Sequence, residues 1–383
     1  MPNPPPKLPG ALPVLGHGLL LRRDPIAFVR DGYAQCGPVF QVQLGPKPAV
    51  VLVGPDLQEL FFTKTDTIFR MDLAYAFLRA CFGDIAFTAS PETYYAERHV
   101  LHAPFKGKKM PGYVAVMQEE TQRWIDGLGE AGTFETVAEM KRLTQNIAAH
   151  ALMGRAFREG LSRDFWPQYD DIAAALDPLL PPHWPLPKFR RRDRARQRIH
   201  EMLRPLLAAR RDAPGDYDYF LADFAVATYQ DGRPLAEARI MNYIMGLIFA
   251  GHETTSGQAS WMIVDLLQHA PWHTRTRDEV DAACVRGAAI GLDTLARLPL
   301  LQAAMRESER MHPVWWRTSR STATPCPPVG WRWSRPPSPT ACPSCFANRT
   351  PMTPADSAPN GTRPPSTATV SLPSAAVCTS ARA

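Results

Sequence analysis

The stretch Ile240 to Leu267, IMNYIMGLIFAGHETTSGQASWMIVDLL, decides the fold of this 383-residue chain. Apolar residues lie on all sides of it, which is typical of a helix buried in the core of a large domain. The length would suit a membrane span, but Glu253 and several neutral polar residues at its centre argue against one. Gly251 and Gly257 each weaken the helix by about 1 kcal/mol relative to alanine.

The polar segment in the middle of this stretch, residues 250–256 (AGHETTS), has two interpretations. A helix interior that is both weak and polar indicates a place where a ligand docks, because burying polar groups is costly unless they are paired or used. Alternatively, the stretch is a kinked core helix whose hydroxyl groups bond back to its own carbonyls. The stretch by itself leaves both interpretations open.

Composition predicts a globular protein without a nucleic-acid site. Hydrophobic residues make up 45% of the chain, enough for a sizeable core, and the formal net charge is a mild +6. The basic runs at residues 106–109 and 190–192 lie within otherwise ordinary helical text and indicate solvated faces. Nucleic-acid binding would require basic residues clustered with aromatic ones. The positive charge instead suits an acidic protein partner.

The seven cysteines have irregular spacing and predict no disulfide framework. Cys342 and Cys345 form a CxxC pair, but no second pair or nearby histidines complete a zinc site. We therefore predict no metal site built from side chains alone. The N-terminal text MPNPPPKLPG contains neither a signal peptide nor a membrane anchor, so we expect a cytoplasmic protein.

Periodicity predicts a mainly α fold with a small β-rich region near the N-terminus. Residues 39–44 and 49–53 alternate with period two and flank Gly45-Pro46, which predicts a hairpin. Residues 72–90 have no clear period and are expected to be a loop. Helices are expected at 25–36, 56–63, 91–128 (with breaks at Pro104 and Pro111-Gly112), 134–154, 164–176, 189–211, 215–229, 271–288 and 298–311, besides the central one.

His252-Glu253 resembles the start of a zinc-protease motif, but that motif needs a second histidine where this chain has Ser256. Glu253-Thr254 is more informative. A carboxylate beside a hydroxyl, at a weak point of a buried helix, can relay protons to a ligand lying over that helix. The alternative is a satisfied polar pair in a core helix.

Glu307 and Arg310 carry a second pattern, on the helix expected at 298–311. They are three residues apart, share one helix face and can form an ion pair. Alone, such a pair is an ordinary surface salt bridge worth well under about 1 kcal/mol. Its context, about 50 residues after the polar segment, makes it informative.

The two patterns, in this order and at this separation, resemble those of the cytochrome P-450 family. The resemblance runs from about Pro4 to Arg320 and implies that the central stretch is the family's long I helix. It implies that Glu253 and Thr254 are a catalytic acid–alcohol pair over the haem. It also implies that Glu307 and Arg310 are the buried ExxR pair of the haem-proximal core.

Further positions add to the resemblance. Ala250 and Gly251 match the part of the I helix that lies against the haem. Tyr94 and Arg98 match a Trp-x-x-x-Arg pattern whose arginine holds a haem propionate. The text at residues 75–87 and 101–110 is similar to the bacterial sterol 14α-demethylase branch, although that branch usually has histidine where this chain has Glu253.

The resemblance implies an oxidoreductase, a monooxygenase that uses haem b and its iron. A cysteine thiolate on the iron favours O–O cleavage. The implied substrate is lipophilic, such as a sterol, a fatty acid or a terpenoid-like molecule. The implied electron donor is a ferredoxin-type protein, and no membrane anchor or nucleic acid is implied.

The text changes character at about Ser319. Residues 321–383 include 13 prolines and contain no lysine and no glutamate, which predicts a disordered tail after a P-450 domain at 1–320. The family's Phe-x-x-Gly-x-x-x-Cys-x-Gly loop, which carries the thiolate, is absent. Cys378 lies in PSAAVCTSA, which has neither Phe nor Gly. The chain as written is therefore predicted to be impaired. The alternative is an inactive pseudo-enzyme or frameshift product, at most a binder of apolar ligands.

We predict a frameshift near residues 319–325, which accounts for the missing loop. Residues 372–381 can be encoded as CTG CCT TCG GCG GCG GTC TGC ACC TCT GCG. Read two bases later, these codons give Ala-Phe-Gly-Gly-Gly-Leu-His-Leu-Cys, which matches the haem loop. Residues 346–360 in the same offset give Arg-Gln-Pro-Asp-Pro-Asp-Asp-Pro-Gly-Arg-Phe-Gly-Pro-Glu-Arg, which resembles the segment that precedes that loop.

Overall fold

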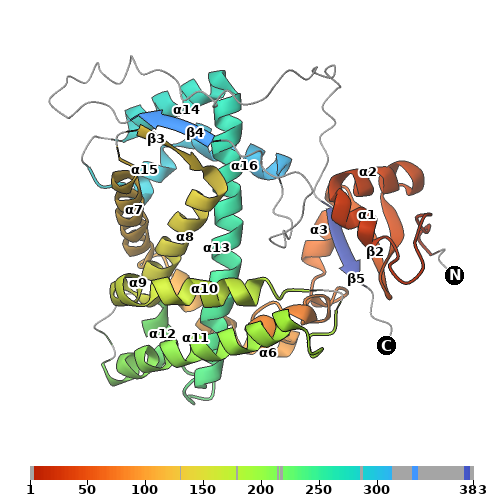
Figure 1. Ribbon diagram of the computed structural model, residues 1–383, viewed down its shortest axis with the longest axis horizontal. Coiled ribbons are helices and arrows are strands. Elements are labelled where there is room, and N and C mark those ends of the chain that lie inside the picture. The colour runs from red at the N-terminus through yellow and green to blue at the C-terminus, as the bar shows by residue number, and fades with distance from the viewer. Residues whose placement is uncertain are drawn as a thin grey trace.

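The computed structural model describes residues 4–129, 131–177, 180–213, 215, 219–284, 288–312, 330–334 and 375–379. Figure 1 shows a helical body around one long helix and, beside it, a smaller lobe built from the N-terminal part of the chain. The mainly α fold with a small β-rich region near the N-terminus is confirmed.

The N-terminal lobe contains α1 (Gly18–Arg23), α2 (Pro25–Cys36), β1 (Val39–Leu44), β2 (Lys47–Val53) and α3 (Pro55–Thr63). Asp24 caps α2 by accepting a hydrogen bond from the Ala27 backbone N–H. β1 and β2 pair antiparallel, with Val39 opposite Leu52 and Leu44 opposite Lys47, so the predicted hairpin is confirmed. Its inward-facing residues pack on α2, with Phe40 and Val51 fully buried.

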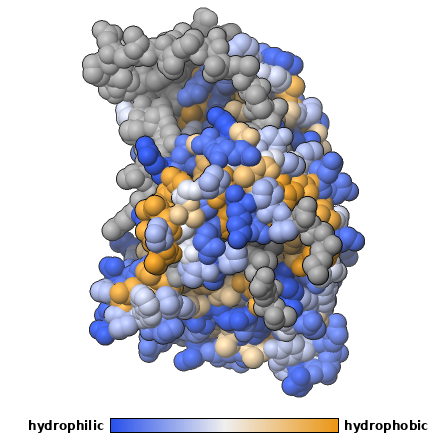
Figure 2. Space-filling model, turned by 90° about the vertical axis from the view of Figure 1, so that its right-hand side faces the viewer, coloured by the Kyte–Doolittle hydropathy of each residue, from blue (hydrophilic) through white to orange (hydrophobic). Residues whose placement is uncertain are grey.

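Several apolar side chains of this lobe are not buried. Large apolar side chains stay exposed over its first 26 residues: Leu12, Val14, Leu15, Leu19, Leu20 and Ile26. Figure 2 views the molecule from the side of the lobe and shows apolar patches separated by polar surface. Among the described residues, no helix combines the length and the apolarity needed to span a bilayer.

The helical body follows. Its elements are α4 (Met71–Ala74), η1 (Ala76–Leu78), α5 (Arg79–Phe82), α6 (Pro91–His102), η2 (Ala103–Phe105), α7 (Met110–Gly127), β3 (Ala131–Glu135), α8 (Thr136–Met153), α9 (Arg155–Gly160), α10 (Ser162–Ala173), α11 (Pro187–Asp212), α12 (Phe220–Val226), α13 (Glu237–Gln268), α14 (Ala270–Ala283), α15 (Leu292–Ala296) and α16 (Pro299–Met311).

Three local predictions are wrong. Pro111 does not break a helix, because it lies in the first turn of α7, where its missing N–H has no helical partner to lose. Residues 72–90, expected to be a loop, contain the short elements α4, η1 and α5. Phe134 belongs to β3, and the helix expected from that residue begins at Thr136, where the Glu135 side chain caps it.

Two short strands come from the proline-rich part of the chain. β4 (Gly330–Ser334) pairs antiparallel with β3, and β5 (Ala375–Thr379) pairs antiparallel with β2, giving the strand order β1-β2-β5. In β5, Cys378 lies opposite Val50. Figure 1 shows β5 in the N-terminal lobe. The rest of the tail predicted at 321–383 lies outside the described residues.

The long helix α13 runs through the body, with α8 packed along it and α10 and α11 crossing nearby (Figure 1). Its first half is buried on nearly all sides, including Ile240, Ile244 and Ile248. From His252 onward only every fourth residue is buried, at positions 252, 256, 260 and 264. The prediction of burial on all sides is therefore right for the first half and wrong for the second. There, residues 251 and 253–255 are exposed, whereas residues 257–259 and 261–263 are half-buried.

An internal ion pair ties α13 to α6. The Arg239 guanidinium donates to the Glu97 carboxylate, with Nε at 2.8 Å from Oε2, and the Tyr243 hydroxyl donates to the same oxygen. The side chains of Glu97 and Arg239 are only 8% and 12% exposed. Because the three groups satisfy each other, the start of α13 can hold charged residues inside the body.

Candidate functional site

The candidate site is the polar segment 250–256 at the middle of α13. His252 and Ser256 are buried, whereas Gly251, Glu253 and Thr254 are exposed. Residues four apart share a helix face, so the buried pair points toward the helices that pack on α13 and the exposed residues face outward. A Cβ atom added at Gly251 would meet nothing within 4 Å. The outer face of this segment is therefore open.

The hydroxyl groups of the segment bond to carbonyls of their own helix. Thr254 Oγ1 donates to the Ala250 carbonyl oxygen at 2.6 Å, and Ser256 Oγ donates to the Glu253 carbonyl oxygen at 3.1 Å. α13 continues without interruption through both residues. The back-bonding expected from the second interpretation of this stretch is present, on a helix that also has an open face.

Glu253 faces a lysine on α8. Its Oε1 lies 3.6 Å from Lys141 Nζ, and the same ammonium lies 3.0 Å from Asp170 Oδ1 on α10. Burial lowers the pKa of Lys141, but the carboxylates of Glu253 and Asp170 outweigh burial, so the pKa is raised. Side chains from α8, α10 and α13 thus form one charge cluster that includes the candidate acid Glu253.

His252 is fully buried beside Glu253. Its Nδ1 lies 3.1 Å from Thr144 Oγ1 on α8, and its ring lies 5.3 Å from the ring of Trp166. Burial, with a smaller contribution from Lys141, lowers the pKa of His252 to about 3. The imidazole is therefore neutral at physiological pH. Its Nε2 has no hydrogen-bond partner among the described residues.

Glu307 and Arg310 form the predicted pair. Arg310 donates two hydrogen bonds to the Glu307 carboxylate, at 2.6 and 2.8 Å, and the hydrogen bond from Arg310 lowers the pKa of Glu307. The pair is not buried as expected, since the side chains are 61% and 37% exposed. α16 packs through its other face, where Ser308 Oγ donates to Asp265 of α13 at 2.6 Å. No described element covers the Glu307 face.

Arg98 lies on α6 and is exposed. Within the described part of the chain, no hydrogen bond or ion pair joins it to another residue, in contrast to its buried neighbour Glu97. The structure therefore brings Ala250, Gly251, Glu253 and Thr254 together on α13, and Glu307 with Arg310 on α16, and it leaves Arg98 apart from both sets.

Haem, which the sequence resemblance implies, fits these residues on one side only. The open face at Gly251 and Thr254 leaves room for a flat ligand. Three cysteines have described side chains: Cys81 on α5, where burial raises the pKa of the thiol to about 11, and the half-buried Cys36 on α2 and Cys284 after α14. Cys326, Cys342 and Cys345 lie outside the described residues. The described residues thus supply a distal wall on α13, and none of Cys36, Cys81 and Cys284 belongs to that helix.

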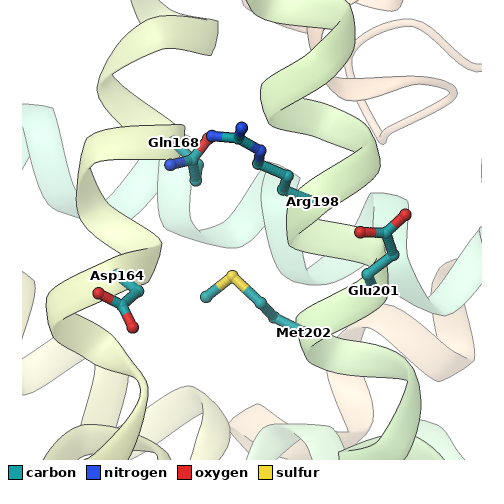
Figure 3. Close-up of a pocket in the computed structure, with 5 residues that line it drawn as sticks. All are labelled: Asp164, Gln168, Arg198, Glu201 and Met202. Carbon is teal, nitrogen blue, oxygen red and sulfur yellow. The ribbon is translucent and has the colours of Figure 1, made fainter.

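A hollow of about 320 Å³ between α10 and α11 is a separate candidate. Figure 3 shows Asp164 and Gln168 on α10 facing Arg198, Glu201 and Met202 on α11, with the Met202 side chain between the two carboxylates. No hydrogen bond links the two acids. Among the described residues, no group of three or more His, Cys, Asp or Glu side chains is arranged to hold a metal ion. The hollow offers no pairing that supports catalysis.

The comparisons with known proteins agree with one another. The sequence model of the cytochrome P-450 family matches residues 5–327. A sterol 14α-demethylase of Mycobacterium bovis is 31% identical over 316 residues, which are 80% of this chain and 69% of the relative. An obtusifoliol 14-alpha demethylase of Triticum aestivum is 29% identical over 315 residues, which are 81% of this chain and 69% of the relative.

A solved structure has the same fold. The retinoic-acid-bound cyanobacterial CYP120A1 superposes with a TM-score of 0.70 at 24% sequence identity, covering 86% of this chain and 71% of that one. Lys141, Asp170 and the buried state of His252 are features of the site that were not predicted from the sequence. Lys141 lies on an amphipathic helix, and nothing in a single sequence distinguishes a bridging lysine there from a solvated one.

Proposed function

The chain belongs to the cytochrome P-450 family, the haem-dependent monooxygenases, and on this basis we propose that its gene encodes an enzyme that inserts one oxygen atom of O2 into a lipophilic substrate. The observation that carries the proposal is the open turn of α13, where Gly251 leaves space and Glu253 and Thr254 stand on the exposed surface. Haem, when bound through a cysteine thiolate, supplies the activation of oxygen.

We propose that the side chains of Glu253 and Thr254 transfer protons from solvent to the bound ligand. The Glu253 side chain is 43% exposed and can exchange a proton with solvent. Thr254 then passes the proton onward, for which its hydroxyl must leave the Ala250 carbonyl oxygen that it now bonds at 2.6 Å. A carboxylate and a hydroxyl in succession are suited to such a transfer, since each can both accept and donate.

The proposed substrate is a lipophilic molecule, which is a sterol, a fatty acid or a terpenoid-like molecule. Two relatives are named as sterol or obtusifoliol demethylases. The half-buried Tyr75 and Phe87, whose rings lie 5.9 Å apart, supply aromatic surface that suits an apolar ligand. Glu253, where sterol demethylases of this branch usually have histidine, supports a substrate outside the sterols.

The proposed electron donor is a ferredoxin-type protein. The chain carries a formal net charge of +6, which attracts an acidic partner and speeds the encounter at low ionic strength. We propose that the enzyme works in the cytoplasm; among the described residues, no helix is long and apolar enough to cross a membrane.

We further propose that the chain as written is impaired by a frameshift near residues 319–325. The family match stops at residue 327, close to the change in composition. Residues 346–360 and 372–381, read two bases later in the same offset, give the two family-like peptides. Exposure of the Glu307–Arg310 pair is consistent with a missing cover. An inactive pseudo-enzyme that binds apolar ligands is the second candidate, favoured by the lack of a cysteine at the open face of α13.

The test of the function uses the chain with its frame restored, produced with haem and supplied with a ferredoxin and its reductase. Incubation with lanosterol, a long-chain fatty acid and a terpene under ¹⁸O₂ is expected to label one product with a single ¹⁸O atom. Thr254→Ala should lose most of this labelling. Thr255→Ala, an exposed neighbour on the same helix, is the matched control and should keep it. Equal loss in both variants contradicts the assigned role of Thr254.

A further inference from the structure

Lys141 lies between two acids that come from different helices. Its Nζ is 3.0 Å from Asp170 Oδ1 on α10 and 3.6 Å from Glu253 Oε1 on α13. Lys141 itself belongs to α8, which packs along α13 (Figure 1). The shorter distance is a hydrogen bond and the longer one is a charge contact only. Asp170 therefore holds the ammonium more closely than Glu253 does.

Lys141 is the cation that Glu253 faces. The other basic side chain near the Glu253 carboxylate is His252, whose Nε2 also lies 3.6 Å from Oε1. Burial keeps the pKa of His252 at about 3, so the ring carries no charge at neutral pH. Among the described residues, no arginine or other lysine makes an ion pair with Glu253. Its position thus depends on one ammonium, and Asp170 competes for that ammonium.

The unpaired nitrogen of His252 gives Glu253 a second reason to lie on this side of α13. Thr144 Oγ1 is the hydrogen-bond partner of His252 Nδ1, and His252 Nε2 is buried without a hydrogen-bond partner among the described residues. A buried polar atom without a hydrogen bond costs about 1–3 kcal/mol. A small inward movement of the Glu253 carboxylate would bring it within hydrogen-bond reach of this nitrogen. Lys141 and His252 therefore both favour the α8 side over the side of Thr254.

We propose that Lys141 is a positioning residue that draws Glu253 toward α8 and that Asp170, by competing for the same ammonium, determines how firmly Glu253 is held there. A displacement of α10 that strengthens the Asp170 contact releases Glu253 toward Thr254. A displacement of α10 that weakens the Asp170 contact keeps Glu253 beside Lys141 on the α8 side. The inference rests on the proposed function for its meaning in proton transfer, but the charge arrangement is a property of this chain without any ligand.

The test measures the reactivity of single lysines in the full chain. Acylation by an amine reagent is followed by mass spectrometry, since only the neutral amine reacts. Glu253→Gln removes one carboxylate and is expected to lower the pKa of Lys141 and speed its acylation by about 3- to 10-fold. Asp170→Asn should do the same. Lys188, which pairs with Asp177 on another part of the molecule, is the internal control and should not change.

Acylation of Lys141 that is unchanged in Glu253→Gln overturns the proposal, because the lysine then belongs to Asp170 alone. Unchanged acylation in Asp170→Asn overturns the competition. If the acylation of Lys188 also becomes faster, a variant that exchanges the charges of residues 141 and 253 tests the contact instead. Lys141→Glu should lower the melting temperature and Lys141→Glu with Glu253→Lys should recover it; no recovery overturns the contact. None of these measurements involves haem, so their failure is distinguishable from failure of the proposed function.

Discussion

The buried state of His252 predicts that this residue contributes to the loss of stability in acid. The pKa of the ring is about 3 in the folded chain, compared with 6.5 when unfolded. Because the folded state binds fewer protons, stability falls as the pH drops from about 6.5 toward 3. At pH 5 the unfolded ring is almost fully protonated and the folded one is neutral. The difference costs about 2 kcal/mol. This figure changes little for any folded pKa below about 4.

The assay is urea unfolding of the full chain at pH 7.5 and at pH 5, followed by tryptophan fluorescence. Trp166 reports locally, since its ring lies 5.3 Å from that of His252. His252→Gln keeps a polar side chain and removes the titration. Its loss of stability between the two pH values should be about 2 kcal/mol smaller than that of the unsubstituted chain. His102→Gln, at an exposed histidine, is the control and should show the unaltered loss.

The reasoning is refuted if His252→Gln loses as much stability on acidification as the unsubstituted chain does. Such a result would mean that the ring is protonated in the folded state or that it is hydrated there. Either condition is incompatible with a buried Nε2 that has no partner.

Two further predictions concern α13 and its ion pair. Gly246→Ala should destabilise the chain by about 1–3 kcal/mol, because the new Cβ would lie 2.8 Å from Ile85 Cγ2. Gly251→Ala, on the same helix but with open space around it, should stabilise the chain by up to about 1 kcal/mol; urea midpoints that move in the same direction contradict this. Glu97→Ala should cost about 3–5 kcal/mol, since Arg239 stays buried without a counter-ion. A loss below about 1 kcal/mol in the same assay would mean that the pair is exposed in solution.

Local patterns in the sequence predicted much of the fold. The alternation in residues 39–53 is enough to define the hairpin, because side chains on successive strand residues point to opposite faces. The long apolar stretch without proline is enough to define α13, because it indicates a buried helix. The pairing of Glu307 with Arg310 followed from helix spacing alone. In each case the partners are close in the sequence or the pattern is internal to one element.

Features that depend on distant parts of the chain could not be predicted in the same way. The exposure of Glu307 and of the outer face of α13 depends on which elements pack against them, and spacing gives no information on that. The contact of Lys141 with Glu253 joins residues more than 100 positions apart, on two helices whose relative rotation sets the distance. His252 was examined as a metal ligand, and its burial against α8 follows only from the packing of the two helices.

Reduced haem with CO gives the most direct test of the central claim, that the distal wall is present in this chain and the thiolate loop lies out of frame. The chain as written and the frame-restored chain would be produced side by side with haem, and the gene sequenced across the codons for residues 317–328. We predict a thiolate-type Soret band for the frame-restored chain and none for the chain as written. A thiolate-type band from the chain as written, or an intact reading frame with no family-like peptides in the offset reading, would contradict this claim.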